Sequence, residues 1–227
     1  MSNEITNKQF REFINWVNKN PDDSIYQVKY EVTAVRDIKA GMIKDTVLRK
    51  ITPVCVSKIL NDIMDQTALS KFDSKYKNYF TDKEYDDYPV VGVSKKAAEY
   101  YCIWKTDQEN ALRKKQGLPP VHLYRLPQEA EWDYVANQSV DNIKSDNKAL
   151  LKKSNDGIAN SWGLTHLEDN VSEWVASRNE TDGITKGGSW NTSPYITERH
   201  ILDPGSKSGN VGFRIVQSYI APVPVKK

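Results

Sequence analysis

The residues from Lys186 to His200 combine the side-chain types of a small chemical site. They read KGGSWNTSPYITERH, so Ser189 follows two glycines and precedes an aromatic ring, further hydroxyl groups and a basic pair. Gly187 and Gly188 permit a strained turn or a close approach to neighbouring backbone. Such a turn would hold the Ser189 hydroxyl in a fixed place, which raises the question of where a nucleophile lies.

The rest of the chain offers little support for serine or metal chemistry. Its three histidines are His122, His166 and His200, and no two of them have the i, i+4 spacing of a helical metal site. We interpret His200, beside Arg199, as a surface residue rather than a base, because most lone histidines are not catalytic. No Gly-x-Ser-x-Gly elbow and no phosphate-binding loop are present. The candidate binding residues around Ser189 are Trp190, Asn191, Tyr195, Arg199 and His200.

The charge balance argues against one large class of partners. Lys plus Arg total 32 and Asp plus Glu 30 among 227 residues, a formal net charge of +2, and the two signs are mixed along the chain. This pattern disfavours a nucleic-acid surface. No apolar run approaches the roughly 20 residues that span a bilayer, and the opening MSNEITNKQF lacks the features of a signal peptide. We expect no transmembrane segment and a chain that is soluble as given.

The two cysteines, Cys55 and Cys102, have a separation that fits neither a zinc site nor a disulfide framework. We expect two buried thiols, because free cysteine is among the most buried residue types. A single disulfide bridge is the alternative if the protein is exported.

The first third of the chain is predicted to hold two helices and two strands. Thr6 and Gln9 have the spacing of a capping box, and NKNPDDS ends the helix that they begin. Its predicted inward face comprises Phe10, Phe13, Ile14 and Val17. Residues 25–35 alternate as a strand, and residues 45–54 are predicted to form a second one. Residues 57–72 are predicted to form an amphipathic helix, with Ile59, Leu60, Ile63 and Met64 inward.

The middle of the chain is predicted to hold two further helices. An extended Val-rich segment leads to Ser94 as N-cap of a long helix, which Gly117 and the following prolines end. Its buried stripe is predicted to be Ala97, Tyr101 and Trp104. A shorter helix follows in RLPQEAEWDYVA, with Pro127 in its first turn. Residues 139–161 are polar and turn-rich and are predicted to form a surface loop.

Several residues that could suggest chemistry have structural interpretations. Arg125 and Glu131 are more readily partners in an ion pair that fixes a loop than catalytic groups. Three tryptophans are predicted to fill the core between loops, namely Trp132, Trp174 and Trp190. None of these roles requires a substrate.

Five segments follow one another in a specific order. They are NEITNKQFREF (3–13), YPVVGVSKKAAEYYCIW (88–104), YRLPQEAEWDYVA (124–136), WGLTHLEDNVSEWV (162–175), and KGGSWN with GNVGFRIV (186–191 and 210–216). This ordered set resembles the formylglycine-generating enzyme domain, the sulfatase-modifying-factor family. The resemblance implies a C-type-lectin-like α+β fold with little regular secondary structure, a short twisted sheet and peripheral helices. We expect residues 1–227 to form one such domain, with insertions near 37–79 and 140–160 that the family pattern does not explain.

In active members of that family the chemistry resides in a cysteine pair that binds copper and activates oxygen. The resemblance places the two cysteines at Thr192 and Thr197 of this chain, counted from Ser189. A threonine hydroxyl forms no thiolate near neutral pH and is a poor ligand for cuprous copper. The resemblance therefore implies a degenerate site of Ser189, Thr192 and Thr197, without enzyme activity and without a catalytic cofactor.

Calcium is the one cofactor that the resemblance leaves open, because family members bind it structurally. The segment EDNVSEW offers Asn170 and Glu173 as hard oxygen ligands for such an ion. The chain departs from the family at Asp169, where glycine is usual.

Among cysteine-less relatives, the chain resembles the gliding-motility and type IX secretion lipoproteins of Bacteroidota, the GldK/PorK and GldJ group. The segments that carry this resemblance are ITNKQFREFINWV, YDDYPVVGVS, YYCIWKT, and KGGSW with GFR. The chain departs from that group by having no lipoprotein signal and by having Lys95 where tryptophan usually follows GVS. The resemblance implies a structural component of a ring, in the periplasm or at the outer membrane if a leader has been removed.

Three functions compete at this point, because a fold does not fix a function. We favour a non-catalytic assembly component whose partners are other proteins of an envelope complex, as an oligomer or a ring. The alternative is an exported ligand- or protein-binding module with a lectin-like fold. A copper-dependent formylglycine-generating oxidase is the least favoured.

Overall fold

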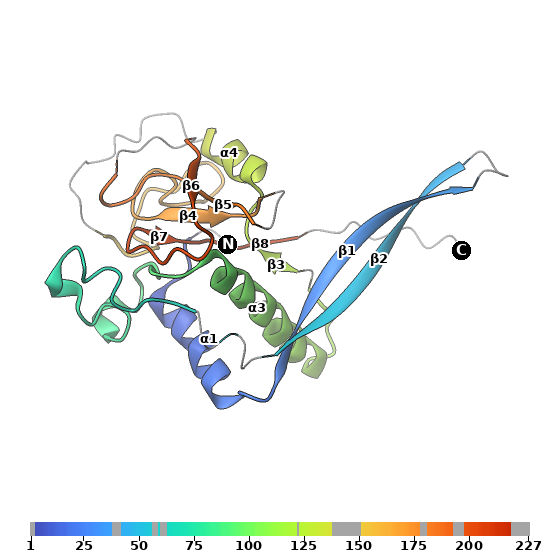
Figure 1. The fold of residues 1–227 in the computed structure, drawn as a ribbon, viewed down its shortest axis with the longest axis horizontal. Helices are drawn as coiled ribbons and strands as arrows, with labels where there is room; N and C mark the ends of the chain where they lie inside the picture. The colour runs from blue at the N-terminus through green and yellow to red at the C-terminus, as the bar shows by residue number, and fades with distance from the viewer. Residues whose placement is uncertain are drawn as a thin grey trace.

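The computed structural model describes residues 3–37, 42–55, 59, 63–121, 123–137, 151–177, 181–192 and 198–218, with residues 26–37 and 42–51 given by their backbone alone. The helices α1 (Asn7–Lys19) and α3 (Lys95–Lys115) lie on one side of a small sheet, and α4 (Glu129–Asn137) lies on the other (Figure 1). A long ribbon of β1 (Ser24–Asp37) and β2 (Met42–Cys55) projects from the end of the helical layer (Figure 1).

The predicted capping box of α1 is confirmed. The Thr6 hydroxyl accepts a hydrogen bond from the backbone N–H of Gln9, and the Gln9 side chain accepts one from the backbone N–H of Thr6 at 3.0 Å. Of the predicted inward residues, Phe10, Phe13 and Val17 are fully buried and Ile14 is partly buried. The sequence therefore places both the start and the buried face of this helix correctly.

The long helix α3 also follows its sequence signals. The Ser94 hydroxyl accepts a hydrogen bond from the backbone N–H of Ala97 at 3.2 Å, and Gly117 follows the helix with a positive φ of +70°. The Tyr101 ring stacks on Phe10 of α1 with 5.7 Å between ring centroids. Aromatic pairs of this kind add about 0.5–1.5 kcal/mol beyond the burial of their area. The two helices are thus joined through aromatic rings.

The central sheet has the strand order β6-β5-β4-β7. Its strands are β4 (Ser172–Val175), β5 (Gly183–Lys186), β6 (His200–Leu202) and β7 (Val211–Gly212). A separate pair joins β3 (Tyr124–Arg125) to β8 (Val216–Gln217). Successive side chains of a strand face opposite sides, so Trp174 packs in the core of α1 and α3 while Val175 packs with Trp132 of α4. The sheet therefore separates two hydrophobic clusters.

The two ends of the described chain are tied together beside this sheet. The backbone N–H of Ile5 donates to the carbonyl of Phe213 at 2.9 Å, and the carbonyl of Ile5 accepts from the backbone N–H of Val90 at 2.9 Å. Ile5 and Phe213 are both completely buried. The segment around Ile5 is therefore part of the core.

The β1–β2 ribbon confirms both strands that the sequence predicts in this region. The strands pair antiparallel over their full length, from Ser24 opposite Cys55 to Asp37 opposite Met42. At the base of the ribbon, Ile25 is buried and Val54 packs partly buried against the core of α1 and α3.

The helix predicted over residues 57–72 is wrong for residues 63–72, which form turns and a bridge, whereas Ile59, described ahead of them, is helical. One Asp65 carboxylate oxygen accepts from the backbone N–H of Thr67 at 2.9 Å and from its hydroxyl at 2.7 Å. Such local side-chain bonds compete with helical ones. The backbone N–H of Asp65 donates to Gly92 instead. Ile59 and Ile63 are nevertheless buried, whereas residue 60 lies outside the described part.

Two smaller differences concern the loops. Helix α4 begins at Glu129, and the first helical bond runs from the N–H of Trp132 to the carbonyl of Gln128. Pro127 therefore precedes the helix, whereas the sequence predicts it in the first turn. Residues 151–161 have no regular secondary structure, in agreement with the predicted loop, while residues 138–150 lie outside the described ranges. Two short 3-10 helices, Ser74–Tyr76 and Lys83–Tyr85, complete the fold.

In the part of the chain that the structure describes, none of the helices combines the length and the hydropathy needed to cross a membrane.

Candidate functional site

The turn that carries Ser189 depends on Gly187. This residue has φ of +84°, and a Cβ atom there would lie 2.8 Å from the carbonyl oxygen of Leu167 and 3.1 Å from the Trp132 ring. The Ser172 hydroxyl on β4 also donates to the Gly187 carbonyl at 3.1 Å. The sequence prediction of a glycine-dependent close approach is confirmed at Gly187, and the turn is packed directly on the α4 tryptophan.

Ser189 lies in a small group of uncharged side chains. Its hydroxyl donates to the Asn191 side-chain oxygen at 2.8 Å and lies 2.8 Å from the Thr192 hydroxyl. The Thr192 hydroxyl also accepts from the backbone N–H of Ser189 at 3.0 Å. Ser189 is only 5% exposed, while Thr192 is exposed. These contacts satisfy the hydroxyls with one another and bring no base to Ser189 among the described residues.

Trp190 and Asn191 extend this group toward the surface. The Trp190 ring nitrogen donates to the Gly209 carbonyl at 3.1 Å, and its ring meets Phe72 edge-to-face with centroids 5.3 Å apart. Phe72 is 54% exposed. Trp132 and Trp174 are buried as predicted, but Trp190 is only partly buried. Trp190 therefore forms part of an aromatic rim and does not fill the core.

Two of the predicted binding residues lie apart from Ser189. Arg199 pairs with Glu129 of α4, with its Nε atom 2.7 Å from a carboxylate oxygen. His200 is partly buried on β6, opposite Thr185 of β5. Tyr195 and Thr197 lie outside the described residues. The structure thus brings Ser189, Trp190, Asn191 and Thr192 together and places Arg199 on the α4 side of the sheet.

A buried ion pair that was not among the predicted site residues lies near this turn. Arg214 Nε and Nη2 donate to the two oxygens of the Glu173 carboxylate, each at 2.6 Å. The Trp132 ring nitrogen donates to the same carboxylate at 2.9 Å. Glu173 is 1% and Arg214 2% exposed. Burial alone would lower the pKa of Arg214, but the adjacent Glu173 charge outweighs it and raises that pKa.

A signal for this ion pair exists in the sequence. Arg214 stands inside the apolar run VGFRIV, and a charge placed there must find a buried partner. The predicted ion pair between Arg125 and Glu131 is confirmed and nearer to the surface, with both Arg125 terminal nitrogens 2.7 Å from a Glu131 oxygen.

The contacts of Asn170 and Glu173 do not fit a calcium ion held by this pair. Both Glu173 oxygens face the guanidinium of Arg214, a cation that would repel calcium. The Asn170 side-chain oxygen accepts from the backbone N–H of Lys152 at 2.9 Å, and its amide donates to Glu4 at 2.8 Å. Among the described residues, no group of three or more His, Cys, Asp and Glu side chains is placed to hold a metal ion.

Asp169, where the family usually has glycine, makes its own ion pairs. Its carboxylate lies 2.7 Å from His166 Nδ1 and 2.8 Å from Lys152 Nζ. Burial would raise the pKa of Asp169, but the bonds from His166 and Lys152 outweigh it and hold that pKa at about 2. For His166, burial would lower the pKa, and the bond to Asp169 and the charge of Glu4 raise it overall. The Asp169 carboxylate is therefore held between two basic side chains, His166 and Lys152.

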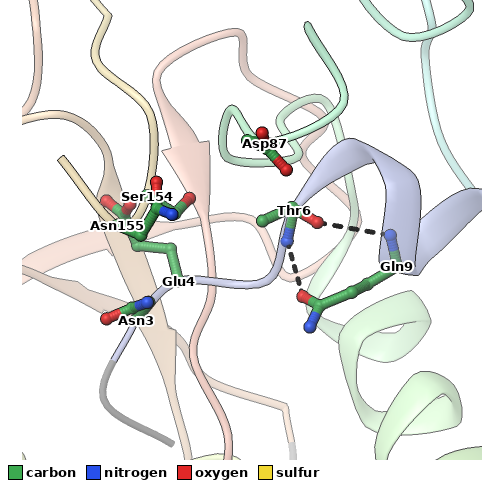
Figure 2. Close-up of a pocket in the computed structure, with 7 residues that line it drawn as sticks. All are labelled: Asn3, Glu4, Thr6, Gln9, Asp87, Ser154 and Asn155. Carbon is green, nitrogen blue, oxygen red and sulfur yellow. Dashed lines mark hydrogen bonds between the residues drawn. The ribbon is translucent and has the colours of Figure 1, made fainter. Parts of the chain in front are cut away.

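A polar cavity of about 320 Å³ lies beside this loop (Figure 2). It is lined by Asn3, Glu4, Thr6, Gln9, Asp87, Ser154 and Asn155. Figure 2 shows the Glu4 side chain extending toward Ser154 and Asn155. Among the described residues, Glu4 Oε1 and Ser154 Oγ are buried without a hydrogen-bond partner. Burial raises the pKa of Glu4 to about 8. No sequence motif indicates this cavity, because its residues come from three separate segments.

The two thiols lie outside the Ser189 turn. Cys102 is 3% exposed within α3, and burial raises the pKa of its thiol. Cys55 ends β2 and is partly buried, and neither cysteine forms a disulfide. The prediction of a buried thiol is confirmed for Cys102 only.

Comparisons with known proteins found matches that cover most of the chain. A family model described as "Sulfatase-modifying factor enzyme 1-like domain" matches residues 1–148 and 137–219. A Bos taurus protein named "Inactive C-alpha-formylglycine-generating enzyme 2" is 25% identical over 248 residues, which cover 92% of this chain and 73% of that protein. The Mus musculus protein of the same name is 28% identical over 168 residues, 57% of this chain and 49% of that protein.

Solved structures with a similar fold include the following one. It is described as "Crystal Structure of CarF", with a TM-score of 0.53 and 16% sequence identity, and the match covers 97% of this chain and 85% of that one. At this identity the likeness concerns the fold alone.

Proposed function

Because this chain belongs to the sulfatase-modifying factor family, we propose that it is a non-catalytic member that works by presenting its surface to other proteins. The observation that carries the proposal is the hydroxyl group at the glycine turn. The resemblance places a cysteine of active family members at Thr192, whose hydroxyl here bonds to Ser189. The relatives from Bos taurus and Mus musculus that bear the word inactive in their names support the same proposal.

The chemistry of these side chains explains the expected lack of activity. A copper-dependent oxidation of a substrate cysteine requires thiolates, which bind cuprous copper and exchange with a substrate thiol. The chain has only Cys55 and Cys102, in β2 and α3. The residues at the turn therefore do not fit copper, and no catalytic step follows from them.

The test is an oxidation assay on the purified chain. A sulfatase-type peptide with one cysteine is incubated with the protein, copper and oxygen, and the product is followed by mass spectrometry. We expect no formylglycine from the wild-type chain. The double variant Thr192→Cys/Thr197→Cys, which has a thiol pair at these positions, is compared with the wild type in the same assay. Formylglycine formed by the wild type would overturn the non-catalytic proposal.

We further propose that the chain is a component of an envelope assembly of the gliding-motility or type IX secretion kind, located in the periplasm or at the outer membrane. The support is the set of segments that resemble that group. We also propose that the loops have a lectin-like arrangement. The β1–β2 ribbon, which projects from the body, gives such an assembly an accessible contact surface (Figure 1).

A pull-down from a native membrane extract tests the assembly role. The bait is the wild-type chain, and the comparison is a variant in which residues 27–52 are replaced by a two-residue turn. Residues 57–72 are unsuitable for removal, because Ile59, Ile63 and Leu69 are buried in the fold. Envelope proteins retained by the wild type and lost from the variant would support the assembly. Identical results without partners would count against it.

The polar cavity favours a second candidate, a binding module for a small polar ligand. Two buried oxygens without partners, Glu4 Oε1 and Ser154 Oγ, are costly unless a ligand or water satisfies them. A thermal-shift screen with monosaccharides and free amino acids would test this function. We expect a ligand to raise the melting temperature of the wild type and not that of Ser154→Ala, with Glu12→Gln on the exposed side of α1 as control.

A further inference from the structure

One edge of the β1–β2 ribbon is open in the described structure. The sheet that contains β1 has two strands, and among the described residues no other strand pairs with the outer edge of β1. An edge of 14 residues presents a row of unpaired N–H and C=O groups that can template another strand. Two-stranded ribbons are also marginally stable alone. The ribbon is therefore expected to gain stability from a further strand.

The two faces of β1 differ in character. By alternation along the strand, the even positions read Ser24, Tyr26, Val28, Tyr30, Val32, Ala34 and Arg36, here called the apolar face, and the odd positions read Ile25, Gln27, Lys29, Glu31, Thr33, Val35 and Asp37, here called the polar face. At the base, Ile25 of the polar face is buried and Pro53, which pairs with Tyr26 of the apolar face, is exposed. At the base of the ribbon, the body therefore covers Ile25 and leaves Pro53 uncovered.

The sequence of β1 is self-complementary. Residues 28–32 read VKYEV, so the segment has valine at both ends, tyrosine at its centre, and a lysine and a glutamate at symmetric positions. We propose that β1 pairs antiparallel with β1 of a second copy of this chain, with Tyr30 at the two-fold axis, to form a four-stranded sheet β2-β1-β1-β2. In this register Lys29 of each copy stands opposite Glu31 of the other.

Other registers are less favourable, because an axis at Val28 or Val32 would form no Lys29–Glu31 pair and closer shifts would be destabilising. A shift by one residue would place the apolar face of one copy beside the polar face of the other, because side chains alternate along a strand. A shift of the axis to Lys29 or to Glu31 would put two like charges directly opposite, which is destabilising. Centring on Tyr30 avoids both and still lets residues 24–36 of each copy pair.

The ribbon itself supplies a reason for this partner. Lys29 stands opposite Lys50 in the register of β1 and β2, a like-charge cross-strand pair. Glu31 of the second copy would stand on the other side of Lys29 and offset that repulsion. Opposite-charge cross-strand pairs stabilise antiparallel pairing. Because the pairing is isologous, the Lys29–Glu31 pair occurs twice in the dimer.

Sedimentation equilibrium of the full chain tests the pairing through three charge variants. We expect the wild type to form a dimer, and Lys29→Glu and Glu31→Lys to dimerise at least tenfold more weakly. An equimolar mixture of those two variants should form a heterodimer, because the substituted glutamate of one then faces the substituted lysine of the other. The double variant Lys29→Glu/Glu31→Lys should regain the homodimer. Far-UV circular dichroism of each variant controls for folding of the body.

A crosslink checks the position of the axis. Both crosslinking variants carry Cys55→Ser. Under mild oxidation, Tyr30→Cys should form an intermolecular disulfide, and Val35→Cys should form at least tenfold less of this disulfide. A wild-type chain that is monomeric at high concentration would overturn the pairing, as would equal dimerisation of all charge variants. Either result would leave the non-catalytic role unaffected, because that role rests on the Ser189 turn.

Discussion

The Glu173–Arg214 pair and the Ser189–Thr192 hydroxyl group belong to the same sheet region but differ in almost every physical respect. The first is charged, buried on β4 and beside β7, and bonded at both carboxylate oxygens. The second is uncharged, follows β5, and ends at an exposed threonine. Trp132 is common to both, because its ring nitrogen bonds Glu173 and its ring packs against Gly187.

The difference shows that the side chains that stabilise the fold are not the ones at the positions of the family's chemistry. Removing one partner of a buried ion pair leaves an uncompensated charge in a medium of low dielectric constant. Exchanging a side chain at an exposed turn position costs little. A member of the family can therefore lose its reactive side chains while its core remains intact.

The largest effect is expected for Arg214→Met. This variant leaves Glu173 buried without its cation, so we expect unfolding to become easier by about 5 kcal/mol. Chemical denaturation measures the loss. The double variant Glu173→Leu/Arg214→Met should recover part of it, because the stranded charge is gone. A loss below about 1 kcal/mol for the single variant would remove the distinction between the two regions.

Trp132→Ala is expected to cost about 4 kcal/mol, because truncation of a buried tryptophan leaves a cavity in addition to the lost burial. The ring is 1% exposed. The variant also removes the hydrogen bond to Glu173. Trp162→Ala, at a ring that is 57% exposed, is the matched control in the same denaturation experiment and should cost much less.

Gly187→Ala should lower stability by about 2 kcal/mol, because a positive φ is strained for alanine. Its Cβ would also overlap the Leu167 carbonyl. Gly117→Ala is the control, because φ is also positive there but the space is open. A larger loss at Gly187 than at Gly117 would isolate the close approach from the backbone strain.

Acid should weaken the Asp169 loop by an amount on the order of 1–2 kcal/mol. The pKa of Asp169 is lowered to about 2 in the folded chain, so its contribution is present above the unfolded pKa of about 4 and is lost as pH falls toward 2. The pKa of His166 is raised, so its contribution is present below about 6.5 and is lost as pH rises through the folded value. Stability of Asp169→Asn should depend less on pH between about 4 and about 2 than that of the wild type.

Thr192→Ala is expected to have the smallest effect, under about 1 kcal/mol, because the threonine is exposed and Ser189 keeps its bond to Asn191. The denaturation midpoint should remain close to that of the wild type. A loss equal to that of Trp132→Ala would mean that the turn is as essential to the fold as the ion pair.

The sequence predicted the elements whose signals are local. Thr6 with Gln9 and Ser94 with Ala97 fix the starts of α1 and α3 through bonds three residues apart. Alternation over residues 25–35 indicated β1, while β2 was indicated only as a candidate strand over residues 45–54. The helix prediction is wrong for residues 63–72 although their apolar residues have a helical period. The Asp65 side chain bonds to Thr67 and the Asp65 backbone bonds to Gly92, and these bonds replace helical ones.

The candidate site was predictable only in part for the same reason. Ser189, Asn191 and Thr192 are neighbours in the chain, and the structure holds them together. Glu173 and Arg214 form an ion pair although they are 41 positions apart, and Glu4 and Ser154 line one cavity from distant parts of the sequence. Contacts of this range depend on the finished fold, so a motif near the turn indicated the place but not its charged surroundings.

The position of Ile5 between Val90 and Phe213 has a consequence for the order in which the chain can fold. Its N–H partner lies more than two hundred positions later in the sequence, and its C=O partner is in the middle of the chain. During synthesis on a ribosome, the segment around Ile5 must therefore wait for the segment around Phe213 before this part of the core closes. Until then the apolar face of α1, with Phe10 and Phe13, lacks the Phe213 ring against which Phe10 packs. Such late, long-range closure slows folding and prolongs the time in which a nascent chain needs protection from aggregation.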